Sequence, residues 1–198
     1  MLACSEACDR NKRPILSVLS HAFADISNVL EIGSGTGQHA VYFGNHLEHL
    51  EWQTSELPEG LQNLRARLAA EGPGNLKEPL NLNVRERPWF RSDAVPTHGL
   101  FTANTLHIMS WADVEHFFAG VGEVLASPGV LCIYGPFLYG GRHTSESNAV
   151  FDRYLQHRDP QSGIKDFQAI AHLADSEGLS FLEDHAMPAN NRLLVWSR

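Results

Sequence analysis

The chain has 198 residues, which is enough for one domain with a sizeable hydrophobic core. Hydrophobic residues make up 43% of the chain and charged residues 19%, as in ordinary globular proteins. The net charge of −8 comes without any local basic cluster, and no apolar run reaches the ~18 residues of a membrane span, so we expect neither a nucleic-acid partner nor a membrane segment.

Through most of the chain, short apolar runs alternate with longer amphipathic stretches, which is typical of βα units around a parallel sheet. Apolar residues at helical spacing predict helices over residues 14–23, 38–50, 59–70 and 111–125. Short apolar runs predict strands over residues 28–32, 52–55, 80–84, 99–103 and 130–134. The last of these runs is continuously apolar, so we expect it to be a central strand of the sheet.

The pattern changes in residues 139–165, which are polar and rich in glycine and serine. They predict at most one helix, near residues 148–157. A long excursion of this kind in a compact domain is usually functional, so we expect a lid or substrate-binding segment, with a disordered loop as the alternative.

The C-terminal part predicts a helix capped by Asp166 and ending at Glu177, and then strands over residues 179–185 and 192–196. The connection between these two strands is too short for a parallel crossover, so the strands form an antiparallel hairpin. The predicted fold is therefore α/β and Rossmann-like, with helices on both faces of a mostly parallel seven-stranded sheet. Because of its antiparallel hairpin, this arrangement fits a class I methyltransferase better than a plain dinucleotide-binding fold.

A glycine-rich turn follows the first strand and opens a helix, which is the setting in which such turns hold nucleotides. Gly33 permits a tight turn, Gly35 lets the backbone approach a ligand, and Gly37 stands at the start of the helix. Gln38 occupies the place of the third glycine of the dinucleotide pattern, and Glu31 would repel a pyrophosphate. The spacing therefore favours S-adenosylmethionine, which carries a positive charge and an amine, over a nicotinamide dinucleotide.

Polar residues also end the next strands of the predicted sheet. Glu56 follows the glycine turn by roughly twenty residues, where an acid can accept hydrogen bonds from both ribose hydroxyls. Asn83, with Val84, ends the third strand and is a candidate for contact with the adenine edge; a turn-forming asparagine is the alternative. Asn104 follows the fourth strand and completes the predicted cofactor-binding set.

Two residues are candidates for catalysis beside the transferred methyl group. His107 follows the fourth strand and has an ordinary pKa suited to a general base near neutral pH. Tyr134 ends the fifth strand and is placed to orient an acceptor. The alternatives are a histidine packed against Trp111 and a tyrosine that only fills the core.

Substrate-binding candidates come from the excursion and the terminal hairpin. Arg142, His143 and Asn148 belong to the densest polar group of the excursion, and Asn191 lies in the hairpin turn. They are predicted to bind a small polar or anionic acceptor, unless the first three only form a solvated loop and Asn191 only shapes its turn.

The cysteines and histidines show no metal-binding pattern. Cys4 and Cys8 are only two ligands, Cys132 lies in an apolar run, and no further pair stands at zinc-finger spacing. We therefore expect no metal. The odd cysteine count and the polar N-terminus indicate a reducing, cytoplasmic location.

Several short motifs are shared with one known family; they begin at Arg10-Asn11-Lys12, Gly35-Thr36-Gly37-Gln38, Ala103-Asn104, Tyr134-Gly135-Pro136, Ser147-Asn148 and Met187-Pro188-Ala189-Asn190-Asn191. Along nearly its full length the chain resembles an uncharacterised methyltransferase-like family, a domain of unknown function that includes mammalian methyltransferase-like protein 26. The resemblance implies a class I S-adenosylmethionine-dependent methyltransferase fold and adds Arg10 and Asn11 as cofactor-binding candidates. Asn83 departs from the aspartate that relatives commonly carry.

The leading hypothesis from the sequence is a methyltransferase that uses S-adenosylmethionine and acts on an unidentified small molecule. A protein that binds S-adenosylmethionine without catalysis is the first alternative. A nicotinamide-dependent oxidoreductase is a second alternative, disfavoured by Gln38 and Glu31. The methyl acceptor and the oligomeric state stay open at this point.

Overall fold

The computed structural model describes residues 5–90 and 96–198, so Cys4 lies outside the described residues. Six α-helices are present in these segments: α1 (Glu6–Ala22), α2 (Gln38–Gly44), α3 (Pro58–Glu71), α4 (Trp111–Val124), α5 (Glu146–Arg158) and α6 (Phe167–Ser176). The seven strands of the main sheet are β1 (Asn28–Ile32), β2 (Glu51–Glu56), β3 (Leu76–Asn81), β4 (Thr97–Ala103), β5 (Leu125–Gly135), β9 (Ser180–Met187) and β10 (Asn191–Ser197). A second, small sheet consists of β6 (Phe137–Tyr139), β7 (Arg142–His143) and β8 (Lys165–Asp166).

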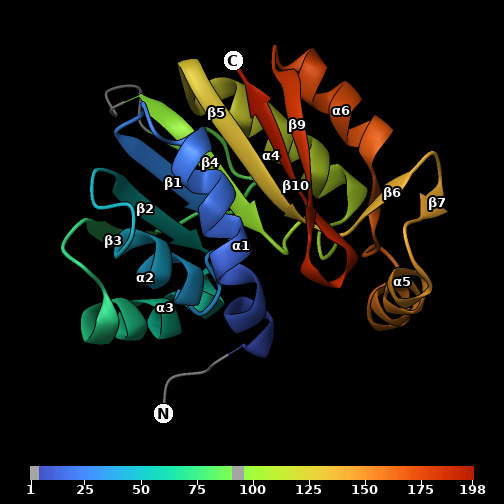
Figure 1. Ribbon diagram of the computed structural model, residues 1–198, viewed down its shortest axis with the longest axis horizontal. Coiled ribbons are helices and arrows are strands. Elements are labelled where there is room, and N and C mark those ends of the chain that lie inside the picture. The colour runs from blue at the N-terminus through green and yellow to red at the C-terminus, as the bar shows by residue number, and fades with distance from the viewer. Residues whose placement is uncertain (1–4, 91–95) are drawn as a thin grey trace.

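The main sheet has the strand order β3-β2-β1-β4-β5-β10-β9 (Figure 1). Every neighbouring pair is parallel except those made by β10, which runs antiparallel to both β5 and β9. The predicted α/β fold with its antiparallel C-terminal hairpin is confirmed. Strand order reverses beside β1, and ligands in open parallel sheets bind at such a point, outside the carboxyl ends of the strands.

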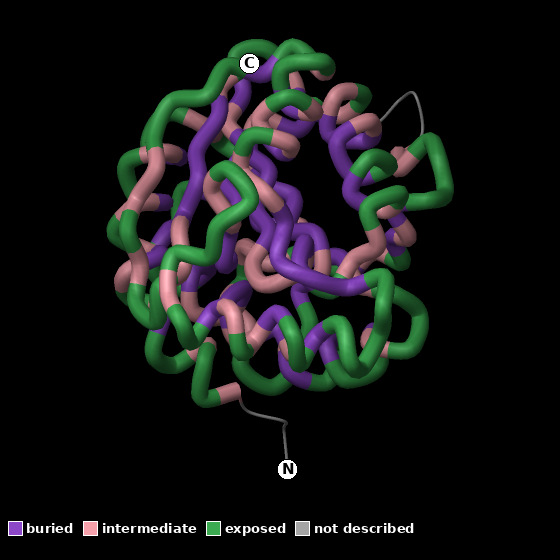
Figure 2. The backbone as a smooth tube through the Cα atoms, turned by 90° about the vertical axis from the view of Figure 1, so that its right-hand side faces the viewer, coloured by how far each residue is buried: buried purple, intermediate pink, exposed green. Residues whose placement is uncertain are grey.

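Each face of the sheet is covered by helices, because the central strands carry apolar side chains on both sides. In β1, Val29 packs into one hydrophobic cluster, whereas Leu30 and Ile32 pack into the other. The first cluster lies under α1 and α2, and the second lies under α4 and α6. In Figure 2 the buried segments, in purple, run mostly through the interior, and the exposed segments, in green, lie mostly around the outside.

Side-chain caps fix where several helices begin. Ser110 accepts a hydrogen bond from the backbone N–H of Asp113 at the start of α4, and the Asp113 carboxylate accepts one in return. Ser145 caps α5 by accepting from the backbone N–H of Asn148, without a bond in return. Asp166 caps α6 by accepting from the N–H of Gln168, as its position before the apolar periodicity predicted.

Several predicted element boundaries are wrong. The helix expected over residues 14–23 begins at Glu6, and the strand expected over residues 130–134 begins at Leu125. The helix expected over residues 38–50 ends at Gly44, although Leu47 and Leu50 beyond it are buried, so their apolar character imitated a longer helix. The third strand runs over Leu76–Asn81 rather than residues 80–84. It is an edge strand with a single buried residue, which gives it little apolar signal.

The excursion of residues 139–165 is folded rather than a plain loop. It contains α5, close to the predicted helix, and most of the small sheet, which lies beyond the ends of β5 and β10 in Figure 1. Its strands have only two or three residues, too few to show a period in the sequence. In the described segments, no helix is both long enough and apolar enough to cross a bilayer.

Candidate cofactor-binding site

A cavity of about 540 Å³ opens at the carboxyl ends of the first four strands, a size that suits a small-molecule ligand. Its lining comes from the ends of β1, β2 and β4 and from the segments that follow β3 and β4. The lining residues are Ile32, Gly33, Gly35, Glu56, Leu57, Leu82, Asn83, Val84, Arg85, Ala103, Asn104, Thr105, Ile108, Met109 and Asp113.

The glycine turn forms one wall of the cavity. Gly33 has φ +70°, and a Cβ at this position would lie 2.5 Å from the side chain of Thr105, so only glycine fits. Gly35 has φ +55°, and nothing lies within 4 Å of a Cβ added to it, so its backbone faces open space. Gly37 starts α2 and packs against Leu64 instead of lining the cavity. The turn therefore offers bare backbone to a ligand at Gly33 and Gly35.

Glu56 reaches from the end of β2 to the glycine turn. Its Oε2 accepts a hydrogen bond from the N–H of Gly35 at 2.6 Å, and its Oε1 accepts one from the N–H of Leu57 at 2.8 Å. Each carboxylate oxygen keeps a further acceptor position. The side chain is thus held at the cavity wall with two acceptor sites left for a diol.

Glu31 does not line this cavity, because its side chain is 2% exposed and turned into the protein. It accepts a hydrogen bond from Nε1 of Trp52 at 2.9 Å. Burial raises the pKa of Glu31 to about 7, and the hydrogen bonds from Trp52 and Ser34 oppose this rise. The structure therefore places Glu31 behind the glycine turn.

Asn83, Val84 and Asn104 line the cavity where the strands end. Asn83 Oδ1 accepts from the N–H of Arg85 at 3.1 Å, so this side chain also makes the turn that the sequence left open as its alternative role. Asn104 has φ +61°, which is uncommon outside glycine, and its N–H donates to the carbonyl of Tyr134 at 2.9 Å. Such a conformation at a cavity wall is typical of functional sites.

The two catalytic candidates lie outside the cavity lining. His107 is 7% exposed and packs edge-on against Phe151, not against Trp111. Burial, and then the charge of Lys165, lower the His107 pKa to about 4, so its imidazole is neutral. Tyr134 is 2% exposed, and its pKa is raised, mainly by burial.

The two N-terminal candidates separate in the structure. Arg10 is exposed and pairs with Glu6 at 3.4 Å, away from the cavity. Asn11 is buried, and its Oδ1 accepts a hydrogen bond from Nε2 of His39 at 2.7 Å. Asn11 also bonds the hydroxyl of Tyr134. It therefore belongs to a buried polar network that joins α1 and α2 to the end of β5.

None of the substrate-binding candidates lines the cavity, and two of them lie beside that network. Asn191 donates to the hydroxyl of Tyr134 at 3.0 Å, and Asn148 donates to the carbonyl of Asn190 at 3.0 Å. His143 lies 3.6 Å from the carboxylate of Asp152. Arg142 is exposed on β7. The structure thus joins Asn148 and Asn191 to the hairpin turn, whereas His143 and Arg142 stay within the excursion.

The excursion is attached to the cavity wall by three successive backbone carbonyls. The carbonyl of His107 accepts from the N–H of Gly163, and that of Ile108 accepts from the hydroxyl of Ser162. The carbonyl of Met109 accepts from Nζ of Lys165 at 2.7 Å. Because Ile108 and Met109 line the cavity, these bonds connect the excursion to it directly.

Sequence reasoning missed about half of the cavity lining, chiefly Leu57, Leu82, Arg85, Thr105, Ile108, Met109 and Asp113. Most of these residues immediately follow a residue that was predicted, so proximity to a strand end was a usable signal. Leu82 precedes a predicted residue and Met109 lies two positions after one. Asp113 is the furthest from any of them, because its place at the cavity depends on the packing of α4. Across residues 5–90 and 96–198, no group of three or more acidic, histidine or cysteine side chains is arranged to hold a metal ion.

Comparison with known families shows to which family the chain belongs. A family profile described as protein of unknown function (DUF938) matches residues 3–198. The chain belongs to this family. The more specific link to mammalian methyltransferase-like protein 26 stays a prediction.

Several solved structures with the same fold are methyltransferases. An O-methyltransferase family protein from Burkholderia thailandensis has a TM-score of 0.81 at 17% identity, over 94% of this chain and 56% of its own. Human N-acetylserotonin methyltransferase, solved in complex with S-adenosylmethionine, has a TM-score of 0.79 at 13% identity, over 98% and 53%. An O-methyltransferase family 2 protein from Planctomyces limnophilus, in complex with apigenin, has a TM-score of 0.74 at 15% identity, over 94% and 61%. This DUF938 chain spans little more than half the length of these structures and shares their fold.

Proposed function

We propose that this protein is an S-adenosylmethionine-dependent methyltransferase that acts on a small molecule. The observation that carries this proposal is that one cavity collects the bare glycine turn, the carboxylate of Glu56 and the polar residues that follow β3 and β4. Each group came from a different part of the sequence. Their meeting at the carboxyl edge of a parallel sheet is typical of a nucleoside-binding site.

The residues of the cavity fit the parts of this cofactor. Gly33 and Gly35 leave room for the cofactor to approach the protein backbone. Glu56 has two free acceptor sites for the ribose hydroxyls. Leu82 and Val84 offer apolar contacts for the base. Glu31 lies behind the turn, where its ionised form would favour a cationic ligand at short range.

Methyl transfer needs alignment more than acid–base chemistry. S-adenosylmethionine supplies an activated methyl group, and the chain aligns the acceptor with it. The low pKa of His107 makes it a weak proton acceptor, and the raised pKa of Tyr134 disfavours its ionised form. We therefore propose that both residues position the acceptor side, next to Asn104, and that the acceptor brings its own nucleophile.

We propose that residues 1–198 act as one methyltransferase domain and that the excursion of residues 139–165 forms the acceptor side. Its attachment to the carbonyls of residues 107–109 supports this role. On this proposal Arg142, His143 and Asn148 meet a small polar acceptor. The net charge of −8 favours a small molecule over nucleic acid, and the proposed location is cytoplasmic.

Calorimetric titration with S-adenosylmethionine, S-adenosylhomocysteine and NAD tests the cofactor. We expect the first two to bind and NAD not to bind. Binding of NAD alone would contradict the proposal and favour the oxidoreductase.

A methyl-transfer assay over pools of small metabolites then tests catalysis. We expect transfer in at least one pool, and a lower rate for His107→Ala and Tyr134→Phe. Cofactor binding without transfer to any acceptor class would favour the non-catalytic binding protein.

A further inference from the structure

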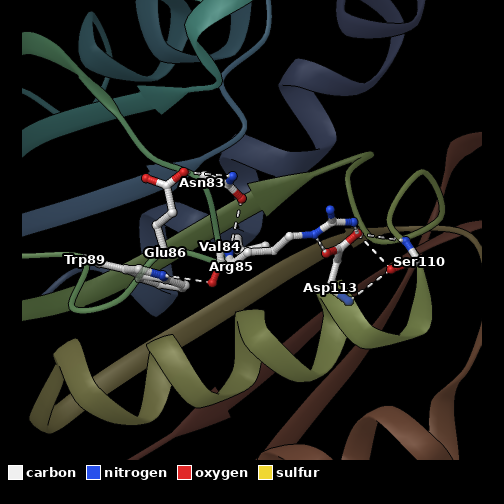
Figure 3. Close-up of polar contacts among 7 residues, drawn as sticks. All are labelled: Asn83, Val84, Arg85, Glu86, Trp89, Ser110 and Asp113. Carbon is white, nitrogen blue, oxygen red and sulfur yellow. Dashed lines mark hydrogen bonds and ion pairs between the residues drawn. The ribbon is translucent and has the colours of Figure 1, made fainter.

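Two charged side chains meet across one side of the cavity. Arg85 belongs to the segment after β3, Asp113 belongs to the first turn of α4, and both line the cavity. Nε and Nη2 of Arg85 donate to the two carboxylate oxygens of Asp113, the second at 2.8 Å (Figure 3). This two-point contact fixes the plane of the guanidinium, which a single contact would not.

The neighbourhood of this pair is held in place independently. Asp113 also accepts from the hydroxyl of Ser110 at 2.8 Å within the cap of α4. Trp89 lies over Gly120 on α4, where a Cβ would come within 2.1 Å of its ring, and its Nε1 donates to the carbonyl of Val84 at 3.4 Å. The Arg85 side chain therefore extends between two anchored segments.

The other polar side chains on this side of the cavity already have partners. Asn83 accepts from the N–H of Arg85 at 3.1 Å and donates to Glu86 at 3.3 Å. The Asp113 oxygens accept from Arg85 and Ser110. Arg85 differs, because its two bonds to Asp113 use only two of its five N–H groups. These bonds leave the other three N–H groups and both flat faces of the guanidinium available to a ligand. Its side chain is 60% exposed.

We propose that Arg85 recognises the base of the bound nucleoside, with the guanidinium, held flat by Asp113, stacked on the purine ring. This inference rests on the proposed function. Arginine stacks on aromatic rings through its delocalised planar cation, a contact that lysine does not reproduce. Arg85 thus contacts the flat face of the electron-rich purine, while the Asn83 amide forms hydrogen bonds within the local turn.

A purely structural role for the pair is the competing explanation, and the chain contains its own control. Arg87, two residues further along, pairs with Glu123 on the same helix. Both ion pairs join the segment after β3 to α4, but Arg87 does not line the cavity. Loss of either pair loosens the same junction, whereas only loss of Arg85 removes a surface from the cavity.

The test compares wild type, Arg85→Ala, Arg85→Lys and Arg87→Ala by calorimetry. The ligands are S-adenosylhomocysteine and 5′-deoxy-5′-methylthioadenosine, which share the adenosine half. We expect both Arg85 variants to bind both ligands about tenfold more weakly, and Arg87→Ala to bind within about twofold of wild type. Circular dichroism and melting temperature check that each variant is folded. If Arg85→Ala does not fold, Arg85→Lys is compared with Arg87→Ala instead.

Four results would overturn the inference. Equal affinities of Arg85→Ala and Arg87→Ala would make the pair structural. Full recovery of binding by Arg85→Lys would show that the positive charge of Arg85, and not its planar guanidinium, is what favours binding of the base. If wild type binds neither ligand, the proposed function fails and the inference fails with it; if wild type binds and Arg85→Ala binds equally well, only the inference fails.

Discussion

Glu56 makes the most direct prediction at the scale of single residues. Glu56→Gln keeps the size of the side chain but removes the charge and one acceptor oxygen, one of the two that now hold Gly35 and Leu57. Because hydrogen bonds to a charged group are the stronger ones, we expect binding of S-adenosylhomocysteine to weaken roughly ten- to a hundredfold. Calorimetry measures the change.

Glu59→Gln is the matched control for this substitution, since Glu59 is an exposed residue in the first turn of α3. The Glu59→Gln variant should bind S-adenosylhomocysteine with the same affinity as wild type. A similar loss in both variants would show that the net charge of the protein, rather than a contact with ribose, controls binding.

Glu31 predicts an unusual pH dependence of stability. Its pKa is raised by burial to about 7 in the folded chain, compared with ~4.3 when unfolded. Between these values the folded state holds a proton that the unfolded state releases, so the contribution of Glu31 to stability falls as pH rises through this window. Glu31→Gln lacks this titration, and the free energy of unfolding of wild type should fall by about 3 kcal/mol relative to it between pH 4.5 and 8.

Urea unfolding of both proteins at several pH values measures this difference. His39 and His107 have pKa values lowered to about 4, so they act in the opposite direction, and their stabilising effect is lost as pH falls from about 6.5 to 4. Both histidines are present in wild type and variant, so their effects cancel in the comparison. A difference that is constant with pH would contradict the raised pKa of Glu31.

At the scale of elements, Lys165 connects the excursion to the cavity. Its ammonium group is buried and donates to the carbonyls of Met109 and Gly163 at 2.7 and 2.9 Å. We expect Lys165→Met to lower the free energy of unfolding by about 1–3 kcal/mol, because two buried acceptors lose their donor. Amide exchange at residues 107–109 and 162–164 should become faster, and mass spectrometry measures this change.

Lys77→Met provides the comparison for a lysine that does not join elements of the site. Lys77 lies on β3 and forms an exposed pair with Glu51. Exposed pairs contribute about 0–1 kcal/mol, so its loss should change little. If Lys77→Met destabilised the protein as much as Lys165→Met, the attachment of the excursion would have no special role.

The elements also show what the sequence can predict. The glycine turn and Glu56 were predictable, because each depends on a short pattern beside a strand that is apolar or partly buried. The third strand was not, since β3 is an exposed edge, whereas Leu82 and Val84 beyond it are apolar because they pack into the core and line the cavity. The meeting of Arg85 and Asp113 depends on how α4 packs, which no local pattern records.

At the scale of the whole molecule, each of the two hydrophobic clusters is built from segments that lie far apart in the sequence. One cluster joins Leu30 of β1 to Trp196 of β10, and the other joins Ile15 of α1 to Val195. The N-terminal and C-terminal parts are therefore expected to unfold together. A ligand that binds only the first four strands should stabilise the hairpin as well.

Thermal unfolding with ligand tests this coupling. At a concentration a hundred times its dissociation constant, S-adenosylhomocysteine should add about 2.7 kcal/mol of stability. For a chain of this size that raises the melting temperature by roughly 5–10 °C in one transition. NAD at the same concentration should leave the transition unchanged; two separate transitions, with only one shifted, would contradict a single cooperative unit.

The buried contact between Trp52 and Glu31 has an optical consequence. The indole of Trp52 is fully enclosed, and its N–H donates to the carboxyl group whose pKa lies near 7. Indole emission responds to a charge that appears beside the ring. The fluorescence of Trp52, isolated as the difference from a Trp52→Phe variant, therefore reports whether Glu31 is ionised without an added label.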